Sequence, residues 1–412
     1  MNVSDNHWAV ERRTDRVNSD CLLPQDVLDI RAKARAFADE VLRPLAHEVN
    51  CAEERRDGFR HDIFQAIAKA GLFAVPFKKD VGGLGLEHPL ACTMAVVEEL
   101  AYYSPGVACA MFDGPAILGA TTIDQAGGEI RAKWIPKIIS GEIVTGFATS
   151  EPAASTDLSA KSIQCKATKV DGGWRMNGTK RFITNSVAAD RTSILCLCDG
   201  AVSVLWVDMH AEGVSVSDPD IKMGNKPQLT AEIYLDNVFV PDCDVVGGVG
   251  RGLRVALGSL SRGRLGISAV GVGMAQRAMD VACAYASKRE VFGQPIASLQ
   301  YWQYRLAEHA VNIEMTRTLF QKAALNADRG GDIEPLAAMS KLKGSELAVD
   351  VVRDAIQACG GYGFVRELKG PGELWPLESI YRDAKIGEIY EGTNEVQKWL
   401  ITRHLLGREI SG

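Results

Sequence analysis

Apolar residues recur at helical spacing along the first third of the chain. Val27, Ile30 and Ala34 follow Pro24, and proline is favoured at the first position of a helix, so this segment is predicted to be helical. Further helices are predicted near residues 63–72, 89–103, 105–124 and 128–139. Residues 24–142 are therefore expected to form an all-helical domain.

The period of the pattern changes to two at about residue 143. Apolar and polar positions alternate between residues 163 and 167, and Asp171-Gly172-Gly173 has the composition of a hairpin turn. Further short strands are predicted at residues 194–197, 202–207, 214–216 and 233–235. About seven short strands at close spacing are typical of a small β-barrel or sandwich.

Helical spacing returns at Leu253 and continues nearly to the end of the chain. Four long helices are predicted at residues 252–289, 298–328, 335–358 and 393–406. Long helices with short links are typical of an antiparallel bundle. Gly271-Val-Gly273 falls inside the first of them and indicates close helix packing rather than a nucleotide-binding turn. The prediction is an α+β multidomain chain with an N-terminal α-helical domain, a central β domain (143–247) and a C-terminal four-helix bundle (248–412).

Length and charge narrow the classes of function. The chain has 412 residues, 46% of them hydrophobic, and a formal net charge of -6. A chain of this length is expected to hold two or three domains. The negative charge argues against a nucleic-acid surface or a polybasic membrane anchor. No apolar run has the roughly eighteen residues that a membrane span needs. We therefore expect neither nucleic acid nor membrane as a partner.

The N-terminus and the cysteines indicate a cytoplasmic protein. Residues 1–23 carry several acids and lack the apolar core of a signal peptide, so we expect a flexible leader. The ten cysteines include no Cys-x-x-Cys pair and no histidine-spaced cluster. We therefore expect free thiols in a reducing compartment and no metal site.

One glutamate near the C-terminus has the surroundings of a general base. Glu391 follows Ile386 and Ile389 and immediately precedes Gly392. A carboxylate at an irregular bend beside apolar surface loses solvation, which raises its pKa toward neutral pH and suits it to accept a proton. The residues alone leave a second interpretation open, in which Glu391 caps the final helix, because acids favour helix N-termini.

A loop rich in hydroxyl groups lies where the first strand is expected to end. Thr149, Ser150, Ser155 and Thr156 surround a turn that contains Pro152. Such a turn offers hydroxyl and backbone N–H donors to the polar edge of an aromatic cofactor. By itself it also fits an ordinary Ser/Thr turn.

An aromatic residue and a hydroxyl share one face of a later predicted strand. Phe182 and Thr184 follow the Asn177-Gly178 turn at alternate positions. The pair can cover one face of a flat cofactor and bond to its edge. The alternative is a core phenylalanine beside an exposed threonine, which is a common strand pattern.

A basic residue and a pair of glycines are candidates for a phosphate group or an adenine ring. Arg289 is at the end of a long predicted helix and can pair with a pyrophosphate. Its alternative role is a favourable charge at a helix C-terminus. Gly360-Gly361 lets the backbone approach a ligand closely.

These stretches, taken in order, resemble the acyl-CoA dehydrogenase family. The run from Tyr390 to Thr393, preceded by Arg-Asp-Ala-Lys and by a Gly-Gly-Tyr-Gly-Phe loop, is similar to that family's C-terminal signature. The resemblance covers residues 26–406 and implies a helical domain, a β-barrel and a four-helix bundle. It also implies FAD as the cofactor, an acyl-CoA substrate and an electron-transfer flavoprotein as the electron acceptor.

The resemblance assigns a role to each candidate residue. Glu391 removes the α-proton as general base, flavin N5 accepts the β-hydride, and the product is the trans-2-enoyl-CoA. FAD contacts are implied for Phe147, Thr149, Ser150, Ser155, Thr156, Phe182, Thr184, Arg289, Phe292, Gln300, Gln357, Gly360, Gly361, Thr393 and Glu395. Substrate contacts are implied for Thr156, Ser261, Arg264, Tyr390 and Gly392. The resemblance implies that the contacts around Arg289 reach the FAD of a neighbouring subunit, so a homo-oligomer is expected. A tetramer is expected because it is the usual assembly in the family.

The chain departs from the family pattern in several places. The departures are Ala153 and Ser155 for glycines, Thr156 for serine, Phe182 for tryptophan, and Ser261 for aspartate. Gly263 stands where isovaleryl- and long-chain-type relatives carry their catalytic glutamate, so the base is expected at Glu391, as in short- and medium-chain types. An insert at about residues 366–375 precedes the C-terminal signature that contains Glu391.

Three alternative functions on the same fold remain open. An acyl-CoA oxidase would pass electrons to oxygen, and an acyl-carrier-protein dehydrogenase would take a different thioester. A non-enzymatic assembly scaffold is the alternative from another class. The presence of Glu391 argues against the scaffold.

Overall fold

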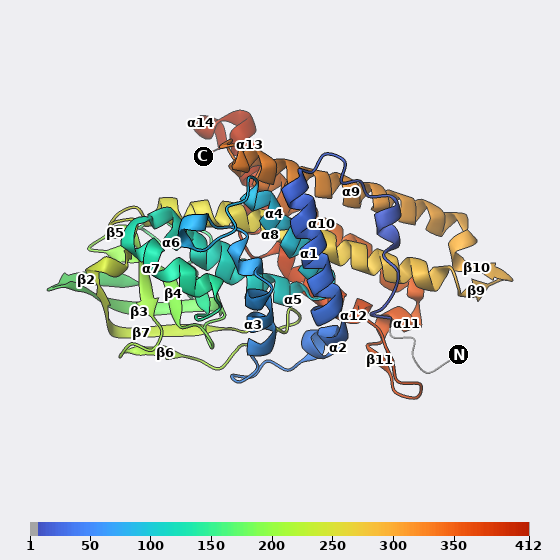
Figure 1. The fold of residues 1–412 in the computed structure, drawn as a ribbon, viewed down its shortest axis with the longest axis horizontal. Helices are drawn as coiled ribbons and strands as arrows, with labels where there is room; N and C mark the ends of the chain where they lie inside the picture. The colour runs from blue at the N-terminus through green and yellow to red at the C-terminus, as the bar shows by residue number, and fades with distance from the viewer. Residues whose placement is uncertain (1–6, 412) are drawn as a thin grey trace.

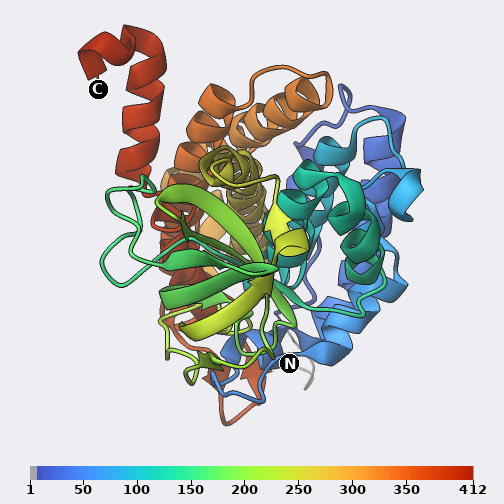
Figure 2. The ribbon, with the colours of Figure 1, turned by 90° about the vertical axis from the view of Figure 1, so that its left-hand side faces the viewer.

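A computed structural model describes residues 7–411 (Figure 1). A helical N-terminal region and a helical C-terminal region pack beside a curved sheet, which lies at one end of the molecule with long helices running away from it. This arrangement confirms the predicted fold class. The side view shows the sheet in front, with the two helical regions on either side (Figure 2).

The N-terminal region is helical throughout. Its elements are η1 (Arg13–Arg16), α1 (Gln25–Phe37), η2 (Ala38–Leu42), α2 (Arg43–Cys51), α3 (His61–Lys69), η3 (Leu72–Ala74), η4 (Lys79–Val81), α4 (Pro89–Ala101), α5 (Pro105–Val107), η5 (Ala108–Gly119), α6 (Ala120–Ala126) and α7 (Gly128–Ile139). Pro89 stands at the first position of α4, where its missing N–H costs nothing.

The central region is one eight-stranded sheet in the order β6-β7-β3-β2-β4-β5-β8, with β1 parallel to β4. The strands are β1 (Thr145–Ala148), β2 (Lys166–Val170), β3 (Gly173–Thr184), β4 (Arg191–Cys198), β5 (Ala201–Asp208), β6 (Val214–Val216), β7 (Thr230–Pro241) and β8 (Val245–Val246), with η6 (Asp242–Asp244) between the last two. β3 carries two bulges, one of them between Lys180 and Ile183. Bulges bend a strand and re-aim its side chains.

The C-terminal region contains the four predicted long helices and several short elements. The long helices are α8 (Gly252–Ala286), α9 (Gln300–Asp328), α10 (Glu334–Cys359) and α13 (Asn394–Leu406). The short elements are β9 (Glu290–Val291), β10 (Gln294–Pro295), η7 (Ile296–Ser298), α11 (Gly361–Phe364), β11 (Glu367–Leu368), β12 (Glu373–Leu374), α12 (Leu377–Ala384), η8 (Lys385–Glu388) and α14 (Arg408–Ser411). The insert forms the hairpin β11–β12.

Glycines let α8 and α10 touch backbone to backbone. A Cβ built on Gly344 of α10 would lie 2.6 Å from Ser268 Cα on α8, and a Cβ on Gly271 would overlap the backbone of Gly344. A Cβ on Gly273 would meet α4 instead, 2.6 Å from the carbonyl oxygen of Glu98. The predicted close helix packing is therefore present on two sides of α8.

Residues 105–126 form one helical stretch that is long and apolar enough to cross a membrane by length and composition. Within the fold, 94% of its most apolar window is buried. It therefore has the character of a core helix, and it matches the helix predicted at residues 105–124.

The N-terminal segment differs from the predicted flexible leader. Residues 1–6 lie outside the described residues, but residues 7–23 pack along the helical core. Trp8 is buried, and Thr14 donates its backbone N–H to the Asp280 carboxylate at 2.8 Å. Arg12 pairs with Glu99 at 2.5 Å. These acids lie on α4 and α8, so their contribution was not visible in the local pattern of residues 7–23.

Trp8→Ala is therefore expected to destabilise the protein by about 3 kcal/mol, because it removes a large buried side chain. Chemical denaturation of the holoprotein measures the effect. Leu22→Ala is the matched control, since Leu22 is 82% exposed in the same segment whereas Trp8 is 1% exposed. Equal stability of the two variants would show that the segment does not pack as described.

Candidate active site

Glu391 lies in a tight bend between η8 and α13. Its φ is +56° and that of Gly392 is +85°, so two successive residues are left-handed. A non-glycine residue in this region is strained by about 1 kcal/mol or more, and such strain concentrates at functional sites. Thr393 rather than Glu391 precedes the first residue of α13. The helix-capping interpretation of Glu391 is therefore wrong.

The backbone and side chain of Glu391 are held differently. Its carbonyl oxygen accepts hydrogen bonds from Arg264 Nε and from Gln397 Nε2, each at 3.4 Å. Its carboxylate oxygen Oε2 is buried and has no hydrogen-bond partner among the described residues. The bend is therefore held in place while the carboxylate oxygen stays available to a ligand.

The carboxylate of Glu391 faces the first half of α8. A Cβ built on Gly263 would lie 3.0 Å from Glu391 Oε2 and 2.9 Å from Leu118 Cδ2. Burial raises the pKa of Glu391 to about 7, and the charges of Arg264 and Lys341 lower it in part. Part of the residue reaches the surface, but the buried oxygen governs the titration. A carboxyl group with this pKa can accept a proton at neutral pH.

Most residues that the resemblance assigns to the substrate lie near Glu391, and Thr156 lies apart from them in sequence and element. Arg264, Tyr390 and Gly392 lie around Glu391, with Arg264 buried and bound to its backbone. The Tyr390 hydroxyl lies 3.2 Å from Cys109 Sγ on η5. Ser261 is buried one helical turn before Arg264. Thr156 belongs to an exposed loop after β1.

A buried ion pair that the sequence analysis missed supports the hydroxyl loop. Glu151 accepts the backbone N–H groups of Gln164 at 2.7 Å and Cys165 at 3.1 Å, and pairs with Lys180 Nζ at 2.7 Å. Lys180 also donates to the carbonyl of Thr149 at 3.2 Å. The loop is thereby tied to β3. A lysine and a glutamate flanking two candidate motifs were the available signal, but their pairing depends on the sheet.

The bulge in β3 explains the position of Phe182. Its φ is +58° and its side chain is 61% exposed, so the interpretation of Phe182 as a core residue is wrong. Thr184 lies on the same open side, because Ile183 between them is buried. The Thr184 hydroxyl accepts a hydrogen bond from Gln228 Nε2 at 2.8 Å. An exposed aromatic ring beside a hydroxyl matches what a planar cofactor needs.

The remaining residues of the implied FAD site lie at the end of β1, in the loop that follows it, and at the start of α13. Phe147, Thr149 and Ser150 are partly buried at the end of β1, while Ser155 lies on the exposed loop that follows. Thr393 and Glu395 flank the first residue of α13, and Glu395 is exposed. They are therefore divided between the sheet and the final helix.

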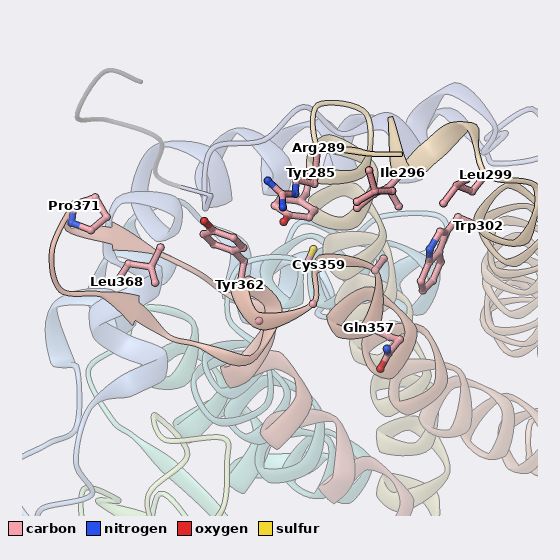
Figure 3. A pocket seen from close by; sticks show the side chains of 14 residues that line it. Tyr285, Arg289, Ile296, Leu299, Trp302, Gln357, Cys359, Tyr362, Leu368 and Pro371 are labelled. Atoms are coloured by element: carbon pink, nitrogen blue, oxygen red, sulfur yellow. The ribbon is translucent and has the colours of Figure 1, made fainter. Parts of the chain in front are cut away.

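A cleft of about 770 Å³ opens near the far end of α8 (Figure 3). It is lined by Tyr285, Arg289, Val291, Ile296, Leu299, Trp302, residues 357–362, Leu368 and Pro371. A Cβ on Gly360 or Gly361 would meet nothing within 4 Å, so their backbone is open to a ligand. Phe292, 97% exposed, and Gln300 stand at the surface nearby.

The insert borders this cleft. Trp375, which follows the hairpin, stacks on His7 with ring centroids 3.6 Å apart. It also packs on Tyr285 and Tyr362. Leu368 and Pro371 come from the hairpin itself. The insert therefore belongs to the end of the site away from Glu391.

The cleft and Glu391 are far apart within one chain. Gly263, beside Glu391, and Tyr285, in the cleft, lie on the same continuous helix α8. The rise of an α-helix puts them roughly 33 Å apart. The candidate FAD residues around Arg289 therefore lie far from Glu391 within one chain.

Comparison with known proteins identifies the fold and its relatives. The N-terminal, middle and C-terminal domain models of acyl-CoA dehydrogenase match residues 24–142, 146–238 and 250–406. The 3-(aryl)acrylate reductase of Clostridium sporogenes is 33% identical over 92% of this chain and 97% of that protein.

Two solved structures are similar over nearly the whole chain. Butyryl-CoA dehydrogenase from Megasphaera elsdenii has a TM-score of 0.87 at 31% identity, covering 94% of this chain and 100% of that one. A chain from work on the electron transferring flavoprotein of Acidaminococcus fermentans has the same TM-score, identity and coverage.

The raised pKa of Glu391 has a consequence for stability. The pKa rises from 4.5 to about 7 on folding, so the folded protein binds this proton more tightly than the unfolded chain does. The associated stability is complete below about pH 4.5 and is lost as the pH rises toward 7. Glu391→Gln is expected to be more stable than the wild type at pH 8, by about 1–3 kcal/mol.

The gain should be much smaller at pH 5, and thermal unfolding at both pH values measures it. Glu87→Gln, at an exposed position, is the control and should show no such gain. A Glu391→Gln variant that is no more stable than the wild type at pH 8 would contradict burial of the carboxylate.

Proposed function

This chain belongs to the acyl-CoA dehydrogenase family, and on that basis we propose that it oxidises an acyl-CoA thioester to the trans-2-enoyl-CoA, with FAD as cofactor, Glu391 as general base and an electron-transfer flavoprotein as electron acceptor. The family places it among the oxidoreductases.

The observation that carries the proposal is the state of the Glu391 carboxylate. Oε2 is buried without a partner, and burial raises the pKa of Glu391 to about 7. An α-proton beside a thioester carbonyl is weakly acidic, so its removal needs a base whose pKa lies near the working pH. Arg264 and Gln397 hold the backbone of the bend, so the base does not have to reorganise when substrate binds.

The described residues fit FAD at both ends of the proposed site. Phe182 presents an exposed ring beside the Thr184 hydroxyl, which suits an isoalloxazine ring. The open backbone of Gly360 and Gly361 and the guanidinium of Arg289 suit a nucleotide and its phosphates. When bound, FAD supplies the acceptor for the β-hydrogen.

The separation of the two ends supports a homo-oligomer in which each FAD is shared. Tyr301, Tyr304, Val311 and Met315 leave an exposed apolar face along α9, next to the cleft. Such a face is typical of a subunit contact. We propose a tetramer, by family resemblance. A cytoplasmic location and an electron-transfer flavoprotein partner are proposed on the same grounds.

The relative named 3-(aryl)acrylate reductase supports a second candidate, reduction of an arylacrylyl thioester by the same site in the reverse direction. The substrate panel therefore includes arylpropionyl and arylacrylyl thioesters beside straight and branched acyl-CoAs. An oxidase is distinguished by rapid reoxidation of the reduced flavin in air. A dehydrogenase of acyl-carrier-protein thioesters is distinguished because only the carrier-protein thioester, and no acyl-CoA, would reduce its flavin.

Glu391→Gln is expected to retain FAD and to lower the rate of flavin reduction by substrate roughly 10³-fold, because the base is lost while the site keeps its shape. Anaerobic stopped-flow spectroscopy at saturating acyl-CoA measures that rate. Glu129→Gln, an exposed acid on α7, is the control and should behave as the wild type. Normal reduction in Glu391→Gln would rule Glu391 out as the base.

Gly263→Ala is expected to slow flavin reduction about tenfold to a hundredfold, since the new methyl group displaces the Glu391 carboxylate from its position over α8. The same stopped-flow assay measures it, with FAD content as a check on folding. Gly370→Ala, whose added Cβ meets nothing within 4 Å, is the control. Unchanged rates would show that the carboxylate works from another position.

A further inference from the structure

Lys341 on α10 is a buried lysine without an acidic partner. Its side chain is 0% exposed, and Nζ donates to Asn394 Oδ1 at 2.9 Å. Among the described residues, no carboxylate oxygen lies within 4.0 Å of Nζ. Burying an ammonium group without a carboxylate is costly, and a neutral amide offsets little of that cost. The position of this charge therefore needs an explanation beyond packing.

The acceptor of this bond ties Lys341 to the bend that carries Glu391. Asn394 is the first residue of α13, three positions after Glu391. Ser345, also on α10, donates its hydroxyl to the same oxygen at 3.1 Å. α10 thus holds the start of α13 by two bonds to one amide oxygen, and the Glu391 turn leads directly into that amide.

Lys341 also acts on Glu391 through its charge. The charged groups that face it come from four elements: Arg264 on α8, Glu388 in η8, Glu391 in the bend and Glu395 on α13. Glu391 is influenced by two cations, Arg264 and Lys341. Arg264 stays charged at any working pH, so Lys341 is the cation of this cluster that can titrate.

We propose that Lys341 is a positioning residue of this active site: its bond to Asn394 holds the catalytic bend, and its buried positive charge keeps Glu391 ionised and ready to accept a proton. The inference deepens the proposed function, on which the role of Glu391 as base rests. The charge effect itself is a property of the folded holoprotein and does not depend on turnover.

Opposing shifts in the two groups follow from this arrangement. Burial lowers the pKa of Lys341 to about 8, and the negative charge of Glu391 raises it in part. The ammonium in turn opposes the effect of burial on Glu391. The two groups titrate as a coupled pair, so removing one charge moves the apparent pKa of the other.

The test is a titration of the FAD-loaded protein by infrared difference spectroscopy, in which the protonated carboxyl band of Glu391 is assigned by its absence in Glu391→Gln. Lys341→Met keeps the length of the side chain and removes the charge. The midpoint of the Glu391 band is expected to move upward by about one pH unit or more in Lys341→Met. An unchanged midpoint would overturn the proposal.

Ser345→Ala is the matched control, because it removes the other bond to Asn394 and leaves the charge of Lys341 in place. Its midpoint should stay within a few tenths of the wild-type value. A shift as large as that of Lys341→Met would mean that displacement of the bend, rather than charge, governs the titration, and would overturn the electrostatic part.

Asn394→Asp decides the question if Lys341→Met fails to fold. The substitution keeps the shape of the side chain and places a carboxylate against the ammonium, so the positive field at Glu391 is cancelled. The same upward shift is expected, and its absence would contradict the proposal. The variant retains a partner for Lys341, which favours folding.

The pH profile of flavin reduction gives the catalytic readout. For Lys341→Met, the rate at saturating acyl-CoA should fall about tenfold at pH 7 and recover near pH 9, with little change in substrate affinity. A loss that is equal at all pH values would contradict the charge role. If no thioester reduces the wild-type flavin, the proposed function fails, while the infrared titration still decides the role of Lys341.

Discussion

Backbone contact between α8 and α10 is the constraint on which the site depends. The two helices are so close that a Cβ on Gly344 would lie 2.6 Å from Ser268 Cα. At that distance no large side chain separates them. Gly263 on α8 lies against the Glu391 carboxylate, and Lys341 on α10 bonds to Asn394 just after the bend, so the two helices hold the bend from two sides and Glu391 Oε2 is buried.

The same enclosure makes the site costly to the folded protein. Glu391 combines a left-handed backbone with a buried oxygen that has no partner, and each feature destabilises the protein by itself. Bonds from Arg264 and Gln397 hold the bend against that cost. A base that is unpaired, partly desolvated and already in position is suited to removing a weakly acidic proton.

Sequence reasoning reached some of these features and missed others for identifiable reasons. The Gly271-Val-Gly273 pattern predicted close packing, because small residues in a helix have one evident use. Lys341 gave no such signal, since lysine in a helix is ordinarily exposed, and the pairing of Lys180 with Glu151 depends on the sheet. The packing of residues 7–23 on the helical core was missed because Thr14 bonds to Asp280, which lies on another element far along the chain.

The sequence by itself determined the succession of helical and alternating periods, the order of the three regions and the residues of the Glu391 bend. These are properties of neighbours along the chain, and they also carried the family resemblance. The tertiary structure alone decided that a bulge exposes Phe182 and that the charges of Arg264 and Lys341 act on Glu391. Desolvation and Coulomb interaction depend on distances between atoms that are remote in sequence, so only the folded chain sets them.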